Sequence, residues 1–179
     1  MREIEIKARL VNKPEVLAKL KDMSVSLSDP IKQHDVVYGR PGMTGGEMDA
    51  IWLRVRTEND VKTIFTLKKP VVGQLDSLEH ELEIGDGEEM KAIMRLLGFE
   101  LFSDVTKHRQ KGKFGEIEIC VDEVDGLGSF IEAEQLTDEN ADHNIIRQEL
   151  WQLFENLTIK KDDEISKGYD ILERELRGL

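Results

Sequence analysis

Cysteine is almost absent from this 179-residue sequence, and its single occurrence, Cys120, excludes a disulfide within the chain. That usage is typical of a reducing compartment. Long apolar runs are also missing, since no stretch approaches the ~18 consecutive apolar residues of a membrane-spanning helix. The amino-terminal residues alternate charged with apolar side chains. We therefore expect a cytoplasmic protein that is neither secreted nor inserted into a membrane.

Positive charge is scarce as well. The 25 Lys and Arg residues face 37 Asp and Glu residues, which gives a formal net charge of -12 at pH 7. A surface of that sign repels polyanions, so nucleic acids and acidic membranes are not expected as partners. With 39% hydrophobic residues, the chain can bury one sizeable core. We predict a single domain over residues 1–179.

Alternation of apolar and polar side chains, with a period of two residues, is the main pattern present. It predicts about eight strands, over residues 2–10, 33–38, 51–56, 61–68, 78–84, 106–111, 114–122 and 130–136. The connections at residues 58–60 and 112–113 are short enough to join only antiparallel neighbours. An eight-stranded antiparallel sheet favours closure into a barrel, because closure removes the exposed edges.

Helical periodicity interrupts the strands in four segments, over residues 14–23, 86–97, 142–157 and 165–176. Asn12 and Asp86 are the expected N-caps of the first two segments. Each segment carries an apolar stripe that needs an apolar surface to cover. The predicted fold class is therefore α+β, mainly antiparallel, with amphipathic helices packed outside the sheet.

One face of the predicted strands carries long charged side chains to an unusual degree. In the first strand Ile4 and Ile6 share one face, so the charged residues at positions 3, 5 and 7 share the other. The same alternation groups Arg54 with Arg56, Glu79 with Glu81 and Glu83, Lys107 with Arg109, Glu118 with Asp122, and Glu132 with Glu134.

Two structures are compatible with this pattern. The charged face can be the solvated side of a half-buried sheet, or the sheet can close with its polar face inward while helices cover its apolar outer face. The apolar stripes of the helices favour the second structure, an eight-stranded barrel or tunnel with a charged lumen. Such a lumen must hold water and a ligand, because unpaired buried charges are costly.

The side chains expected in this lumen suit a polyphosphate together with a divalent metal ion. Arg and Lys side chains bind phosphate oxygens, and carboxylates are ligands that Mg²⁺ or Mn²⁺ prefers. The four histidines lack the paired spacing of a zinc site, and the glycine-rich segment 39–46 lacks the ending of a nucleotide-binding loop. The cations that this interpretation places in the lumen are Lys7, Arg54, Arg56, Lys68, Lys107 and Arg109.

A series of short motifs resembles the CYTH superfamily of triphosphate tunnel metalloenzymes. The chain opens with Glu-Ile-Glu-Ile-Lys at residues 3–7, which is similar to the ExExK signature of that family. Further matches follow in order: Leu-Arg-Val-Arg at 53–56, Thr-Leu-Lys at 66–68, Glu-Leu-Glu at 81–83, Lys-His-Arg at 107–109, and the DxxxGLGxFxExE pattern at 122–134. Ser166 and Tyr169 resemble its closing helix.

The resemblance implies a tunnel that binds a triphosphate, with site residues that can be carried over by position. It implies metal binding by Glu3, Glu5, Glu132 and Glu134, with Asp122 close by, and phosphate binding by Lys7, Arg54, Arg56, Lys68, Lys107 and Arg109. For catalysis we expect Lys7 to take part, and we expect a second metal ion, or a carboxylate such as Glu5 or Glu81, to orient the attacking water. The implied cofactor is Mg²⁺ or Mn²⁺.

Two positions depart from the family pattern. Glu79 stands where many members have an arginine. Tyr38 comes one residue late in its element, so its side chain is predicted to lie on the opposite face unless a β-bulge intervenes.

Three functions remain open at this point. The first is metal-dependent hydrolysis of a small triphosphate such as thiamine triphosphate, tripolyphosphate or a nucleoside triphosphate. The second is class IV adenylyl cyclase activity, which converts ATP to cyclic AMP and pyrophosphate. The third is a polyphosphate-binding module without catalysis. The expected partner is a small-molecule triphosphate, and a homodimer is compatible with the sequence.

Overall fold

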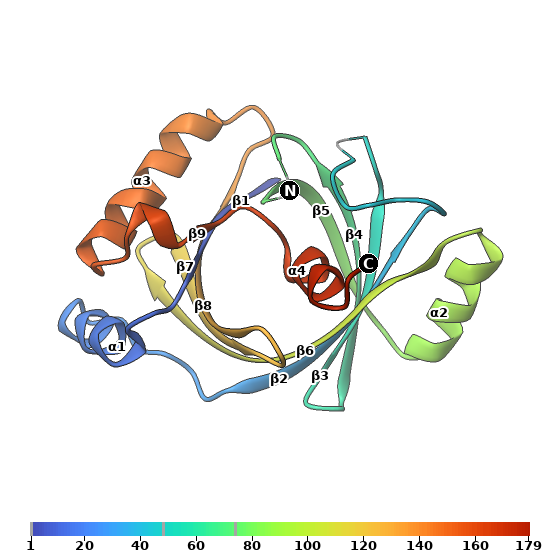
Figure 1. Cartoon of the computed structure of the whole chain (residues 1–179), viewed down its shortest axis with the longest axis horizontal. Helices are drawn as coiled ribbons and strands as arrows, with labels where there is room; N and C mark the ends of the chain where they lie inside the picture. Colours follow the sequence, from blue (N-terminus) through green and yellow to red (C-terminus); the bar gives the residue numbers. More distant parts are fainter. Residues whose placement is uncertain (1, 48, 74) are drawn as a thin grey trace.

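The computed structural model describes residues 2–47, 49–73 and 75–179. Within these residues nine strands form one antiparallel sheet, in the order β5-β4-β3-β2-β6-β7-β8-β1-β9, and an additional pairing of β5 with β1 closes it (Figure 1). Eight long strands make the barrel: β1 (Arg2–Arg9), β2 (Ile31–Gly39), β3 (Trp52–Glu58), β4 (Lys62–Pro70), β5 (Asp76–Ile84), β6 (Glu100–Phe114), β7 (Ile117–Val124) and β8 (Gly128–Thr137).

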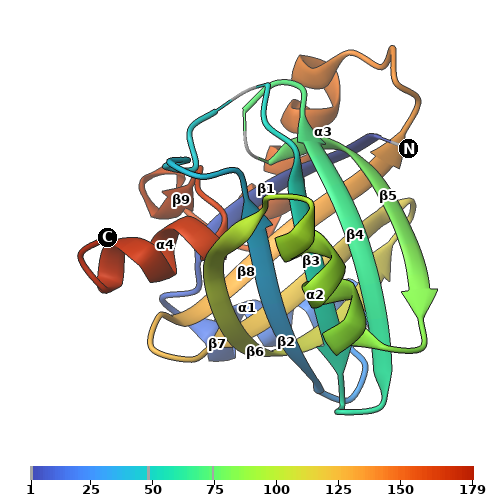
Figure 2. The same cartoon turned by 90° about the vertical axis from the view of Figure 1, so that its right-hand side faces the viewer.

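Four helices accompany the barrel in the described part of the chain: α1 (Lys13–Asp22), α2 (Gly87–Leu96), α3 (His143–Asn156) and α4 (Tyr169–Leu176). In Figure 2, α2 lies against the outer face of β3 and β4, with which it makes its main strand contacts. In Figure 1, α4 is seen against the centre of the ring of strands. The predicted eight-stranded antiparallel barrel with amphipathic helices is confirmed.

The largest apolar core lies outside the barrel wall rather than inside it. Ile4, Ile6 and Ile131 project outward from β1 and β8 and are completely buried. They pack with Leu150 and Phe154 of α3, and with side chains of α1, in one cluster. A second cluster joins the outer faces of β2 and β3 to α2. The helices therefore bury the apolar parity of the strands, and the charged parity faces the interior.

Several predicted boundaries were wrong. The turn between β6 and β7 lies at Gly115 and the residue after it, not at residues 112–113, because Gly115 takes the positive φ of 60° that the reversal needs. The last helix begins at Tyr169 rather than at residue 165, and residues 164–165 instead form the short strand β9 against β1.

The predicted N-caps had different outcomes. Asp86 caps α2 by accepting a hydrogen bond from the backbone N–H of Glu89 at 3.0 Å. Asn12 occupies the predicted N-cap position of α1 but makes no side-chain capping hydrogen bond, and its side-chain amide donates to Glu15 at 2.7 Å. Among the described residues, we find no helix long and apolar enough to cross a membrane.

Candidate active site

The barrel encloses a cavity of about 490 Å³ whose wall is dominated by charge. Every strand from β1 to β8 contributes at least one lining side chain, because each presents alternate residues inward. All six cations predicted for the lumen lie there: Lys7, Arg54, Arg56, Lys68, Lys107 and Arg109. The lining carboxylates are Glu3, Glu5, Asp35, Glu79, Glu81, Glu118, Glu132, Glu134 and Asp170.

Arg56 and Arg109 are held by bidentate ion pairs across neighbouring strands. Arg56 on β3 donates to both carboxylate oxygens of Asp35 on β2, at 2.6 and 2.7 Å. Burial alone would raise the pKa of Asp35, but the charge and hydrogen bonds of Arg56 hold it well below its usual range. Arg109 on β6 binds Asp122 on β7 in the same way and also contacts Glu132. Both guanidinium groups are therefore fixed before a ligand arrives.

Two lysines, Lys7 and Lys107, also belong to the cationic part of the wall. Lys7 Nζ lies 3.1 Å from carboxylate oxygens of both Glu5 and Glu132. Among the described residues, the ion pairs of Lys107 Nζ are both long, 3.9 Å to Asp35 and 3.8 Å to Asp122. Burial and the neighbouring Arg109 lower the pKa of Lys107 to about 8. Lys107 is thus the cation least compensated by carboxylates, and an anionic ligand would stabilise its charge.

Three carboxylates from β1 and β8 converge at one place in the cavity. Ligand oxygens of Glu3, Glu5 and Glu134 all lie within 4.8 Å of one another. Burial, together with the other nearby carboxylates, raises the pKa of all three, to about 7 for Glu3. Among the described residues Glu134 has no cation within 4 Å. A set of hard oxygen donors in mutual repulsion fits a divalent cation such as Mg²⁺ or Mn²⁺.

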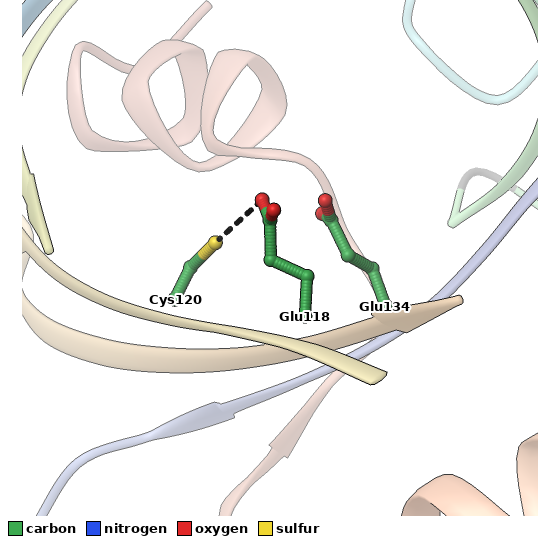
Figure 3. Close-up of side chains that lie close together, drawn as sticks. All are labelled: Glu118, Cys120 and Glu134. Carbon is green, nitrogen blue, oxygen red and sulfur yellow. Dashed lines mark hydrogen bonds between the residues drawn. The ribbon is translucent and has the colours of Figure 1, made fainter. Parts of the chain in front are cut away.

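Glu134 also belongs to a second group, which Figure 3 shows. Glu118 and Cys120 project from β7 beside Glu134 of β8, and the three possible ligand atoms lie within 4.8 Å of one another. The Cys120 thiol lies 3.8 Å from Glu118 and is completely buried, which raises its pKa. Lys111 forms an ion pair with Glu118. A protonated thiol beside a paired carboxylate is a weaker set of metal ligands than the three glutamates.

Two residues implied as metal ligands occupy other surroundings. Glu132 is not part of the three-glutamate group, because its oxygens are engaged by Lys7 and Arg109. Asp122 is completely buried behind the cavity lining. It accepts hydrogen bonds from Arg109 and, at 2.9 Å, from the hydroxyl of Tyr169. Glu81, the predicted alternative for orienting water, lies half-exposed and binds Arg54 at 3.1 Å.

The two departures from the family pattern have clear structural outcomes. Glu79 faces the cavity and forms an ion pair with Lys68, its cross-strand neighbour. Burial would raise the pKa of Glu79, but Lys68 and Arg54 lower it to about 2, so it carries a full negative charge. Tyr38 lies outside the barrel against α2, as predicted from its parity. A register irregularity occurs at Val37 and Tyr38, but the extra residue is Phe102 of β6, so the face of Tyr38 is unchanged.

Sequence reasoning did not assign several lining residues. Asp35 is the one charged residue of β2 among the described residues of the cavity lining, and Trp52 lines the cavity on the same face of β3 as Arg54 and Arg56. Tyr169 and Asp170 reach the cavity from the start of α4, which the predicted helix boundary obscured. The signal for Tyr169 was its resemblance to the closing helix of the family.

A family model described as the CYTH domain matches residues 1–169. A protein of Methanocaldococcus jannaschii, named as a candidate adenylate cyclase, is 32% identical over 181 residues, which covers 100% of both chains.

Solved structures resemble the whole barrel. A Pyrococcus horikoshii protein is 26% identical, with a TM-score of 0.80 and 99% of each chain covered. A Hippeastrum protein, described as a candidate adenylyl cyclase with a dominant triphosphatase activity, is 18% identical. Its TM-score is 0.60, with 94% of this chain and 91% of that chain covered. The last likeness is one of fold alone.

Proposed function

Because this chain belongs to the CYTH family, we propose that it is a metal-dependent enzyme that hydrolyses a small triphosphate inside its barrel. The substrate class comprises thiamine triphosphate, inorganic tripolyphosphate and nucleoside triphosphates. We also propose that nucleic acids and membranes are not its partners, because the net charge of -12 opposes both.

One observation carries the proposal: buried cations and a group of three carboxylates line the same cavity. Lys7 and Glu5 are neighbours on one face of β1 and bind each other at 3.1 Å, so the two kinds of side chain meet directly. Phosphoryl transfer requires little covalent chemistry from a protein and depends on positioning and charge neutralisation. A wall with fixed guanidinium groups and metal-binding carboxylates supplies both.

The metal would be held by Glu3, Glu5 and Glu134, with Mg²⁺ or Mn²⁺ as the fitting ions. When bound, such an ion supplies charge neutralisation on phosphate oxygens and lowers the pKa of water. The protein residues perform the remaining work. Lys107 and Arg109 bind the phosphate chain, and their near-complete burial strengthens each interaction.

Catalysis then depends on where the attacking water is held. Lys7 is 2% exposed and lies beside Glu5, so it can neutralise charge that develops on the transferring phosphoryl group. Glu81 lies on β5, bound to Thr66 at 2.8 Å and to Arg54. A carboxylate in that position can accept a hydrogen bond from water and orient it toward phosphorus.

Adenylyl cyclase activity is the second candidate. It is favoured by the Methanocaldococcus jannaschii relative, which carries that name and matches over its full length. Cyclisation requires the ribose 3′-oxygen to lie in line with the α-phosphorus, which demands a fixed base and sugar. Hydrolysis requires only a bound phosphate chain and an oriented water, and the cavity wall provides for phosphate most clearly.

The test is a parallel assay of the purified protein with tripolyphosphate, thiamine triphosphate and ATP, in Mg²⁺, in Mn²⁺ and in excess chelator. We expect orthophosphate release from at least one substrate, and none in chelator. Cyclic AMP with stoichiometric pyrophosphate as the main products from ATP would establish the second candidate instead. Binding of all three without any product would identify a polyphosphate-binding module.

A further inference from the structure

The charges that line the cavity do not sum to a positive value. Nine carboxylates face seven cations, counting Lys111 with the six named above, so the formal charge of the described lining is −2. Tripolyphosphate carries about four negative charges near neutral pH. Although arginine and lysine side chains line the cavity, the lining as a whole lacks the excess positive charge that a free polyphosphate needs.

Glu79 has a distinct place in this balance. Glu79 of β5 lies directly opposite Lys68 of β4 in the sheet, and their side chains form an ion pair. Ser77 donates a second hydrogen bond to Glu79 at 2.9 Å, which fixes the carboxylate. The side chain of Glu79 is only 10% exposed, so solvent screens its charge weakly. Lys68 is therefore neutralised where it lines the cavity.

Lys68 also lies next to the group of three carboxylates. Its Nζ is 3.8 Å from Glu3, one member of that group. A divalent cation bound by the three carboxylates adds two positive charges close to the Lys68–Glu79 pair. With such an ion in place, the negative charge of Glu79 is offset locally. Without it, the charged carboxylate of Glu79 opposes an incoming phosphate, and the three glutamates add to this to the extent that they are ionised.

We propose that Glu79 is a specificity-determining residue that makes triphosphate binding conditional on a divalent metal ion. This inference rests on the proposed function, because it concerns the ligand of the same cavity. It predicts that the protein distinguishes a metal-complexed triphosphate from the free anion. Exchanging Glu79 for a neutral residue should release Lys68 and weaken that distinction.

The experiment measures binding of a non-hydrolysable, methylene-bridged tripolyphosphate by calorimetry, once with Mg²⁺ and once in excess EDTA. The variant Glu79→Gln keeps the size of the side chain and can still accept from Ser77. Glu83→Gln is the matched control, since Glu83 belongs to the same strand but is 68% exposed and does not line the cavity. The double variant Lys68→Gln/Glu79→Gln removes both charges of the pair.

We expect the wild type to bind at least about tenfold more weakly in EDTA than with Mg²⁺. Glu79→Gln should gain about tenfold in EDTA, the effect of one weakly screened charge near the ligand, and change less with Mg²⁺. Glu83→Gln should keep the wild-type ratio, whereas the double variant also loses Lys68, one of the cations assigned to phosphate binding, and should bind more weakly than Glu79→Gln under both conditions. If Glu79→Gln alone folds poorly, the double variant is compared with Lys68→Gln, and the loss of Glu79 should again strengthen binding in EDTA more than with Mg²⁺.

Three results would overturn the inference. Equal binding by the wild type with and without Mg²⁺ would remove the distinction itself. An unchanged ratio in Glu79→Gln, or the same gain in Glu83→Gln, would show that Glu79 is not its source. In these cases the proposed function stands. Failure of the wild type to bind the analogue under either condition would instead overturn the proposed function, and this inference with it.

Discussion

The hydroxyl of Tyr169 donates a hydrogen bond to Asp122 at 2.9 Å, which joins the start of α4 to a buried carboxylate of β7. The same ring covers the ammonium group of Lys7, 4.1 Å from its centroid, and packs edge-on against Phe130. Lys107 also lies over this ring, 4.9 Å from its centroid, so α4 is anchored beside Lys7 and Lys107, which are both assigned to phosphate binding. Polar and cation–π contacts with residues of the site therefore help to position α4, in addition to its apolar contacts.

Shortening Tyr169 should separate its polar and apolar contributions. Tyr169→Phe removes one hydrogen bond while Asp122 keeps Arg109, so we expect a loss of about 1 kcal/mol in the free energy of unfolding. Tyr169→Ala also removes the packing on Phe130 and should cost about 3–5 kcal/mol. Urea denaturation measures both values. The exposed Leu96→Ala should stay within about 0.5 kcal/mol, and equal losses in both Tyr169 variants would contradict this account.

Lys107 should destabilise the empty protein while it strengthens ligand binding. Its folded pKa of about 8 is lower than the ~10.4 of an unfolded lysine, so the unfolded chain holds more protons between these values. Lys107 therefore lowers the free energy of unfolding most strongly below pH ~8, and this destabilisation decreases as the pH increases to ~10.4.

Lys107→Met removes this titration. We expect the variant to be more stable than the wild type at pH 7, by on the order of 1–3 kcal/mol, and the difference to shrink by pH 10. Tripolyphosphate should bind it at least about tenfold more weakly. Denaturation at pH 7 and pH 10 measures the change in stability, and calorimetry measures the change in tripolyphosphate affinity. The exposed Lys113→Met is the control. A variant that is less stable at pH 7 would refute the assignment.

Metal binding can be tested through Glu5, which lies in the group of three carboxylates. Glu5→Gln keeps the shape of the side chain but removes one anionic ligand, so the Mn²⁺ concentration for half-maximal activity should rise about tenfold. In the absence of substrate, Mn²⁺ at about a hundred times its dissociation constant should stabilise the wild type by ~2.7 kcal/mol. Glu116→Gln, exposed in the β6–β7 turn, should behave as the wild type. Full activity in excess chelator would exclude a metal role.

The alternation of side chains was enough to predict the strands and to place Lys7 and Arg109 on charged faces. It could not decide whether those faces line a lumen or meet solvent. That choice depends on the closure of the sheet, which rests on three residue pairs between β1 and β5, more than 70 residues apart. No local pattern encodes such a contact.

The ion pairs inside the cavity could not be predicted from the sequence either. Asp35 binds Arg56 because the two lie opposite each other in the register of β2 and β3, and Asp122 lies opposite Arg109 in the same manner. Register follows from exact turn positions, and the β6–β7 turn was misplaced. The resemblance supplied a role for Asp122 near a metal, but only register shows that Arg109 and Tyr169 engage its carboxylate.

A buried ion pair lies where β1 meets β5 and closes the barrel. Arg2 of β1 donates to both carboxylate oxygens of Asp76 at the start of β5, each at 2.7 Å, and Asp76 is completely buried. His143, at the start of α3, shares a hydrogen bond of 2.6 Å with the same carboxylate. Arg2 also donates to the backbone carbonyls of Glu139 and Ala141.

Breaking this pair should open the barrel where few backbone pairs hold it. Asp76→Ala leaves the buried Arg2 without its carboxylate and should cost about 3–5 kcal/mol in the free energy of unfolding. His143→Ala removes only one of several bonds to Asp76 and should cost about 1–3 kcal/mol. Because Glu3 lies in the same three-residue pairing of β1 with β5, Asp76→Ala should also weaken metal binding, whereas His143→Ala should not. Hydrogen exchange of the β1 and β5 amides, followed with and without Mn²⁺, measures both effects. Unchanged exchange in Asp76→Ala would show that the backbone pairs alone close the barrel.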